Sequence, residues 1–429
     1  MVKASPRPRA VAVAVLATVV ATATMLSATV PAGAAPPPGS LDPTFGGGVV
    51  LGPEGFSSDV EEVVTQPDGK VLATGRYSTG PELYVMVLRY GTDGVLDPSF
   101  GGGDGMALID FEPGNTFDHV ADLALAPDGK IVVVGGFGAV TVARLLTDGT
   151  LDPTFGVDGI MSTHFSPDGG IANSVHDVAV RPDGRIVIGA QARGQLGAFV
   201  AIQLTAAGFI DPTYGTGGIA VAFVPGRNLW PRGLVLDQQG RAVLVSHDSG
   251  QWRTFLTRFD ARGRVDRTFG LGGISGSPMK FPSELALAPD GSLVVSGYGD
   301  SGPAPFQVAR FRGDGMPDFG FGIFGIGAVA VPAPGLDGGA WGVAVRPDGA
   351  IIAAGLNGTG SIVVVRFLTT GVVDPTFGTG GITVTPIGQI YSGARSVALD
   401  PDGDIVVGGV QIFWPDGYDR WMVARYTGA

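Results

Sequence analysis

Short apolar runs alternate with turn signals at a regular spacing from residue 41 to the end of the chain. The runs at 123–125 and 131–134 are typical, and the Pro-Asp-Gly turn between them predicts a β-hairpin. A third run in each unit carries one Arg between apolar residues, as at Arg144, and a fourth run follows, as at 219–224. None of these runs has a helical period. The pattern therefore predicts four β-strands in most units, in the same order each time.

A six-residue motif, Leu-Asp-Pro-Thr-Phe-Gly at 151–156, separates the third strand from the fourth. Its Asp-Pro pair opens a type I turn, and we expect its Leu and Phe to be apolar plugs. Copies begin at residues 41, 96, 151, 210, 265 and 373, and a worn copy begins at 317. Seven four-stranded units of about 56 residues predict an all-β fold, a seven-bladed β-propeller of antiparallel blades over 41–429.

Two details of this fold follow from the order of its parts. The chain begins with a motif and a fourth strand, and it ends with the first three strands of a blade. The ring can close only if 49–51 joins the C-terminal blade, which leaves no open edge. Each third-strand Arg also precedes the Asp of the motif by eight residues, which predicts a structural ion pair across the turn. Gln203, opposite Asp211, replaces the Arg in one unit.

The combination of Leu-Asp-Pro-Thr-Phe-Gly, Pro-Asp-Gly-Lys and an Ala-Arg-Leu strand resembles the delta-60 repeat, a bacterial β-propeller repeat. The resemblance covers 41–429 and weakens at Gln203, at Gln238 and Gln239, and at the worn motif. It implies the propeller fold and often an exported protein. It implies no defined activity and no catalytic residue.

Residues 1–34 have the features of a secretory signal peptide, with basic residues, an apolar run at 10–30 and Ala-Gly-Ala at 32–34 as a cleavage site. The run is also long enough for a membrane anchor, which is the alternative. Residues 35–40 would then be a short proline-rich leader outside the fold. We expect a secreted protein, extracellular or in the cell envelope, without a membrane span after cleavage. The formal net charge of −12 excludes nucleic acid as a partner.

The sequence offers no motif for catalysis or metal binding. The histidines, His119, His164, His176 and His247, lack the spacing of metal ligands, and no Asp-x-Asp-x-Asp-Gly calcium loop or nucleophile elbow occurs. The chain has no cysteine, so a disulfide framework and a lipid-anchored lipoprotein are both excluded. We therefore assign no catalytic residue, no metal and no cofactor.

The loops on one face of the predicted ring differ from blade to blade, while the loops that carry the two turn motifs are nearly identical. Variable loops usually form the binding face of a repeat protein, and aromatic side chains are favoured anchors there. The alternative is loop drift, with aromatic residues covering the blade ends. We expect Trp230 and Trp341 at the rim of the axial channel. The same loops carry Tyr77, Glu82, Tyr84, Arg193, Gln195, His247, Trp252, Tyr298, Tyr391, Trp414 and Tyr418.

Four carboxylates stand five residues before the Pro of the Pro-Asp-Gly turn, where the first strand begins near the axis: Glu62, Asp122, Asp177 and Glu284. Such a ring could hold a cation, or a cationic or hydroxyl-rich ligand. The alternative is that the carboxylates cap exposed backbone N–H groups at the start of the strand.

Together these features favour a binding or scaffold module for an unidentified protein or carbohydrate, and we expect it to be a monomer. The candidate ligand-binding residues are Glu62, Asp122, His176, Asp177, Trp230, Glu284 and Trp341. The alternative is an extracellular propeller enzyme, a lyase or hydrolase, that works at the channel mouth with His176 and an acidic neighbour.

Overall fold

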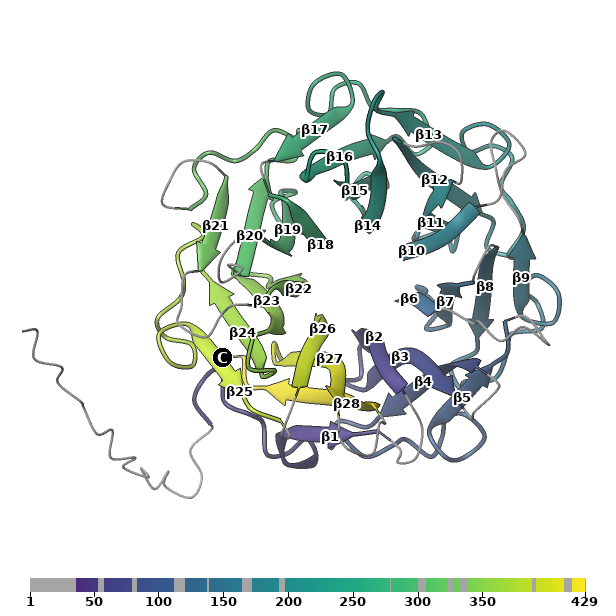
Figure 1. Ribbon diagram of the computed structural model, residues 1–429. Helices are drawn as coiled ribbons and strands as arrows, with labels where there is room; N and C mark the ends of the chain where they lie inside the picture. Colours follow the sequence, from purple (N-terminus) through teal and green to yellow (C-terminus); the bar gives the residue numbers. More distant parts are fainter. Residues whose placement is uncertain are drawn as a thin grey trace, which may run out of the picture. The chain divides into compact units, whose positions relative to one another are not determined.

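The computed structural model describes residues 36–52, 58–78, 83–111, 120–136, 139–163, 172–192, 197–277, 279–299, 306–322, 327–331, 338–387, 391–412 and 419–428. These residues form seven four-stranded antiparallel sheets arranged around an axis, which is the predicted seven-bladed β-propeller (Figure 1). Among them, no helix is long and apolar enough to cross a membrane.

Within each blade the strands follow one another outward from the axis (Figure 1). Blade 1 consists of β2 (Ser58–Thr65), β3 (Val71–Ser78), β4 (Leu83–Tyr90) and β5 (Met106–Ile109). Blade 2 consists of β6 (Val120–Leu125), β7 (Ile131–Gly135), β8 (Val140–Leu145) and β9 (Ile160–Thr163). Blade 3 consists of β10 (Ala172–Val180), β11 (Ile186–Ala192), β12 (Ala198–Leu204) and β13 (Ile219–Phe223). Blade 4 consists of β14 (Leu229–Leu236), β15 (Ala242–Asp248), β16 (Arg253–Phe259) and β17 (Ile274–Ser277).

The remaining blades repeat this order. Blade 5 consists of β18 (Phe281–Leu287), β19 (Leu293–Tyr298), β20 (Phe306–Phe311) and β21 (Ala328–Val331), and blade 6 of β22 (Ala340–Val345), β23 (Ile351–Leu356), β24 (Ile362–Phe367) and β25 (Ile382–Thr385). Blade 7 combines β26 (Tyr391–Leu399), β27 (Ile405–Ile412) and β28 (Asp419–Tyr426) with β1 (Val49–Leu51), which follows the short 3-10 turn η1 (Gly46–Gly48).

The hydrophobic core lies between neighbouring blades. Between blades 2 and 3, for example, Val132 and Val134 of β7 share one buried cluster with Ile186 and Ile188 of β11. The second and third strands are apolar on both faces because a blade packs against each face; all six residues of β8 are buried. This explains why the sequence shows continuous apolar runs there instead of strict alternation.

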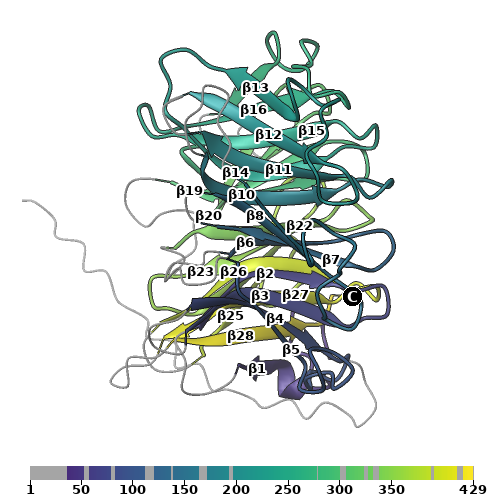
Figure 2. The same ribbon diagram turned by 90° about the vertical axis from the view of Figure 1, so that its right-hand side faces the viewer.

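The ring closes between the two ends of the chain. Strand β1 pairs with β28, with Val50 opposite Val423, and the two lie side by side at the rim (Figure 2). The pairing predicted for 49–51 is therefore present.

The leader also belongs to the fold, contrary to the expectation for residues 35–40. Gly39 donates to the Thr427 carbonyl at 2.7 Å, and Thr427 donates to that of Ser40 at 2.9 Å. The Pro38 carbonyl accepts the Gly378 N–H at 2.9 Å, and Gly39 has a φ of +83°. In blades 1 to 6 a continuous turn joins the third strand to the motif. In blade 7 the leader and the C-terminal residues rebuild that turn from two separate ends.

The aromatic residue of each motif is the buried plug. Phe45, Phe100, Phe155, Tyr214, Phe269, Phe321 and Phe377 are all 0% exposed. The Leu of the motif is less buried than predicted, since Leu151 is 37% exposed, so the Phe supplies most of the apolar burial.

The predicted ion pairs across the turn are present. Their closest N–O distances are between 2.5 and 2.9 Å for Arg89–Asp97, Arg144–Asp152, Arg258–Asp266, Arg310–Asp318, Arg366–Asp374 and Arg425–Asp42. Each guanidinium also lies over the aromatic plug of its own motif, 4.6 to 4.9 Å from the ring centre. Each of these arginines therefore ties the third strand to the motif by charge and by ring contact.

Blade 3 has Gln203 instead of Arg, and its guanidinium comes from Arg181, the residue that follows the inner strand β10. Gln203 donates to Asp211 at 2.7 Å and accepts from Arg181 at 2.7 Å, and Arg181 lies 5.9 Å from the centre of the Tyr214 ring. Arg181 directly precedes the Pro-Asp-Gly turn, so the same assembly is built from a different position of the repeat.

Candidate functional site

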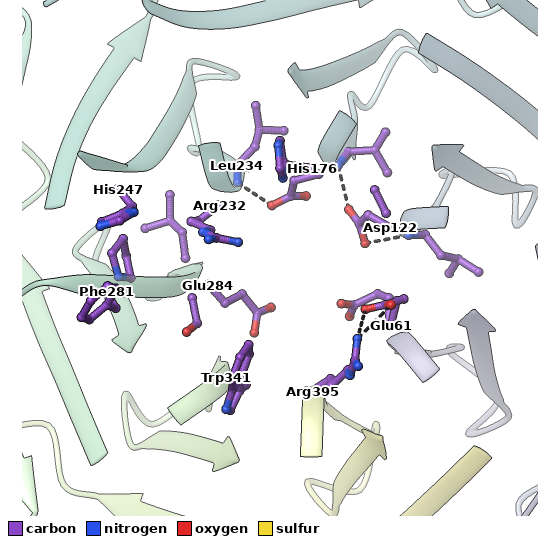
Figure 3. Close-up of a pocket in the computed structure, with 18 of the residues that line it drawn as sticks. Glu61, Asp122, His176, Arg232, Leu234, His247, Phe281, Glu284, Trp341 and Arg395 are labelled. Carbon is purple, nitrogen blue, oxygen red and sulfur yellow. Dashed lines mark hydrogen bonds and ion pairs between the residues drawn. The ribbon is translucent and has the colours of Figure 1, made fainter. Parts of the chain in front are cut away.

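A cavity of about 660 Å³ lies where the inner strands of all seven blades begin, and it is lined by residues of β2, β6, β10, β14, β18, β22 and β26 (Figure 3). Six of the seven candidate residues line it: Glu62, Asp122, His176, Asp177, Glu284 and Trp341. Trp230 does not. The variable face predicted from the sequence therefore opens onto a hollow that every blade helps to form.

A β-bulge in each inner strand directs one side chain into this cavity. In β2, for example, Val60 pairs with Gly75 and Glu62 with Thr74, so Glu61 is left without a partner in the ladder. A bulge re-aims a side chain and interrupts pairing, and this one recurs in all seven blades. The seven bulge residues all line the cavity: Glu61, Ala121, His176, Arg232, Ser283, Trp341 and Arg395.

In three blades the residue after the bulge is a carboxylate that connects its blade to the next one. Asp122 accepts the Val178 N–H at 2.7 Å, and Glu284 accepts the Val343 N–H at 2.7 Å. Asp177 accepts the Leu234 N–H in the same way. These three carboxylates therefore cap backbone N–H groups, which was the structural alternative for the predicted acidic ring.

The same position is filled differently in the other blades. The Ser396 hydroxyl accepts the Val63 N–H at 3.2 Å and donates to Glu62 at 2.6 Å. At Gly233 an added Cβ would lie 2.8 Å from the Leu285 nitrogen, so the neighbouring strand comes too close for a side chain. At these five positions a carboxylate or hydroxyl binds the next inner strand, or glycine leaves room for it. Glu62 differs, because it accepts from Ser396 of the preceding blade.

Burial and mutual repulsion shift the carboxyl groups of this ring toward their neutral forms. Burial raises the pKa of Glu284 to about 8, against the hydrogen bond from Val343. Burial raises the pKa of Glu62 and of Asp177 well above the usual range, and the charge of a neighbouring carboxylate adds to both shifts. Burial also raises the pKa of Asp122, while a hydrogen bond from Asp177 opposes the rise. All four shifts favour the protonated form of these carboxyl groups.

The residues that the structure describes contain no group of three or more His, Asp or Glu side chains that could hold a metal ion. This agrees with the engagement of the carboxylates by backbone N–H groups, which leaves them poorly placed to converge on a cation.

The accessible charges in the cavity are mainly positive. Arg395 pairs with Glu61 at 2.8 Å and with Asp59 at 3.2 Å, and Arg76 pairs with Asp59 at 2.8 Å. Arg232 differs, because no carboxylate among the described residues lies within ion-pair distance of it, and burial lowers its pKa. Figure 3 shows Arg232 on the opposite side of the cavity from Glu61 and Arg395. An unneutralised guanidinium in a cavity is a ready partner for an anion.

The two tryptophans expected at the rim have different places. Trp341 is a bulge residue of the cavity wall and is 40% exposed, whereas Trp230 is 41% exposed but lies outside the lining. Sequence reasoning missed Phe281, which lines the cavity and stacks on Tyr298. Phe281 precedes Pro282 at the same position of the repeat at which Trp230 precedes Pro231. This match to Trp230 could have identified Phe281 as a candidate from the sequence. Glu82, Arg193, Gln195, Trp414, Tyr418, His119 and His164, with the Tyr391 side chain, lie outside the described residues.

Fold and site together define a β-propeller with a polar cavity at one end of its axis. Four stretches of the chain, 66–100, 126–155, 288–321 and 346–377, match a family described as "Domain of unknown function (DUF5122) beta-propeller". These four matches confirm the resemblance to a β-propeller repeat of the delta-60 type. No curated protein matches the sequence.

Solved structures show a likeness in fold. A catalytically inactive virginiamycin B lyase from Staphylococcus aureus with quinupristin has a TM-score of 0.53 and 13% identity, over 88% of this chain and 98% of the lyase. The polysaccharide lyase Uly1 has a TM-score of 0.51 and 11% identity, over 86% of this chain and 90% of that chain. At these identities the likeness concerns the fold alone.

Proposed function

We propose that this protein is an exported ligand-binding module whose site is the cavity at the mouth of the axial channel. One observation carries the proposal: each of the seven blades contributes a bulge side chain to one cavity, and these side chains differ in chemistry. Bulge residues take no part in the ladder, so they are free to vary while the turn motifs hold the ring together.

The test separates two tryptophans of nearly equal exposure. The mature protein is screened against glycan arrays and peptide libraries, and affinities are then measured by calorimetry. We expect Trp341→Ala to weaken binding at least tenfold, because an interface anchor of this type contributes about 2 kcal/mol or more. Trp230→Ala is the matched control and should bind as the parent does. Equal binding by all three proteins would place the ligand elsewhere.

A second candidate function is an enzyme at the same site. Asp122 and Asp177 both line the cavity, and burial raises the pKa of each carboxyl group, a property that a general acid or base requires. His176 lines the same cavity. If the bound ligand is chemically altered, and if His176→Ala and Asp177→Asn each abolish turnover while binding persists, the enzyme is the correct description.

Export and the monomeric state complete the proposal. The signal-like features of residues 1–34 support cleavage after Ala34, which would leave intact the leader that closes the ring. N-terminal sequencing of the secreted protein should begin at Ala35, and light scattering should give the mass of one chain. Detection of the uncleaved chain in the membrane fraction would support the anchor alternative.

A further inference from the structure

Five rings form a continuous aromatic row, of which four (His247, Phe281, Tyr298 and Trp341) line the cavity and the fifth, Trp252, extends the row beyond the lining. It runs from Trp252 through His247, Phe281 and Tyr298 to Trp341, with successive ring centres 5.4, 5.1, 4.7 and 5.8 Å apart. Phe281 and Tyr298 are nearly parallel, with 8° between their planes. Figure 3 shows His247, Phe281 and Trp341 on the same side of the cavity. The row therefore crosses blades 4, 5 and 6.

The row is most exposed at its two ends, partly exposed at Phe281 and Tyr298, and buried at His247. Trp252 is 47% exposed and Trp341 is 40% exposed, whereas His247 is 6% exposed. Large exposed aromatic rings cost free energy in water, so their clustering beside a cavity indicates a surface that packs against flat apolar groups. The length of the row suits a ligand with more than one ring.

The backbone holds the far end of this row in place. Trp252 has a φ of +53°, a conformation that non-glycine residues rarely adopt and that is common at ligand sites. The fully buried Asp248 fixes this loop: its carbonyl accepts the Trp252 N–H at 2.8 Å, and its carboxylate accepts the N–H groups of Gly250 and Asn228 at 3.0 and 3.1 Å. The exposed tryptophan is therefore positioned before any ligand arrives.

The charge beside the row decides which ligand fits. Burial, followed by the positive charge of Arg232, lowers the pKa of His247, so the imidazole is neutral at pH 7. Arg232 and Tyr298 line the same cavity. An aromatic surface by itself would suit a quaternary ammonium group, but the unneutralised Arg232 repels a cation here. A carboxylate, in contrast, can accept two parallel hydrogen bonds from a guanidinium.

We infer that the site binds an acidic saccharide, a chain of pyranose rings that carry carboxylates, such as an oligouronate. The C–H face of each sugar ring would pack on the aromatic row, and one carboxylate would bind Arg232. This inference rests on the proposed function and adds the chemical class of the ligand.

The experiment compares matched acidic and neutral ligands on matched variants. Oligomers of galacturonic, glucuronic and mannuronic acids are titrated by calorimetry, each beside its methyl ester, which keeps the rings and removes the charge. We expect the acid to bind at least tenfold more tightly than the ester, since a hydrogen bond to a charged group contributes about 1.5–3 kcal/mol. Arg232→Gln should abolish the difference between acid and ester, and Trp341→Ala should weaken both.

Two controls keep the test specific. Arg264→Gln removes a cation whose side chain is 65% exposed, in a turn outside the cavity lining, and Trp230→Ala removes an equally exposed tryptophan; neither should change binding. Equal affinity for acid and ester, or no binding by any oligouronate, overturns the inference. A neutral glycan or a peptide that binds in a Trp341-dependent manner also overturns it, while the proposed function stands. An unaltered melting temperature confirms that each variant is folded.

Discussion

Arg144 is the residue at which the stability of a blade can be tested most directly. Its guanidinium pairs with Asp152 at 2.8 Å, donates to Thr154 at 3.2 Å and to the Ala206 carbonyl of the next blade, and lies 4.7 Å from the centre of the Phe155 ring. The two charged side chains are 10% and 2% exposed, so the interaction is largely shielded from water. We predict that Arg144→Gln destabilises the protein.

Loss of one partner from a buried ion pair costs about 3–5 kcal/mol, because the other charge is left unpaired. In the variant, Asp152 still pairs with Lys130 at 3.1 Å and accepts two hydrogen bonds from Thr154. Its negative charge therefore remains partly compensated. We therefore expect Arg144→Gln to lower the free energy of unfolding by about 3 kcal/mol. Urea denaturation followed by tryptophan fluorescence measures this, and Arg264→Gln, a largely exposed cation, should stay within about 0.5 kcal/mol of the parent.

The arrangement in blade 3 suggests a second substitution that should restore the stability of Arg144→Gln. There Gln203 is joined by Arg181, and the position equivalent to Arg181 in blade 2 is Ala126. The double change Arg144→Gln with Ala126→Arg copies the arrangement of blade 3 and should recover at least half of the lost stability. If the single change costs no more than Arg264→Gln, the ion pairs do not stabilise the ring. If the double change recovers nothing, the equivalence of the two arrangements is wrong.

Three further predictions concern the ring as a whole. Deletion of 36–40 should lower the melting temperature, because it removes the rebuilt turn of blade 7, and deletion of 36–52 should lower it further, because it also removes β1; equal melting curves would contradict this. Phe155→Ala should cost about 3–5 kcal/mol in urea denaturation, against little for Phe319→Ala, whose side chain is 62% exposed. For Glu284, the pKa of about 8 in the fold means that the folded state keeps a proton that the unfolded chain has released, so stability falls as the pH rises from about 4.5 to 8. Glu284→Gln should flatten that decline in melts recorded across the window, and an unchanged slope would contradict it.

The repeat made the fold predictable, and departures from the repeat limited what could be predicted of the site. Strand number, ring closure and the pairing of Arg89 with Asp97 follow from the period and from residue spacing, which the sequence displays directly. The replacement of the guanidinium by Arg181 does not, because it depends on which side chains meet between strands. The aromatic row was missed for the same reason: Trp252 and Phe281 lie 29 residues apart in the chain and meet only when blades 4 and 5 pack.

The carboxylates show what spacing alone could not establish about the site. Sequence places Asp122, Asp177 and Glu284 in one register, and that register is the one whose side chains seat the next inner strand. A one-residue bulge separates this structural register from the register that faces the cavity, and the offset has no sequence signature of its own.

The bulge also explains how a repeat protein can hold a site without weakening its ring. A paired inner-strand residue must keep its ladder hydrogen bonds and its packing between blades, so its identity is constrained. A bulge residue makes no ladder hydrogen bonds, so its identity is less constrained. The seven bulge residues are Glu61, Ala121, His176, Arg232, Ser283, Trp341 and Arg395. In four blades the residue that follows the bulge accepts a backbone N–H of the next inner strand. Seven side chains that differ in charge and shape therefore line one cavity, while the strands that carry them keep the repeat's pairing.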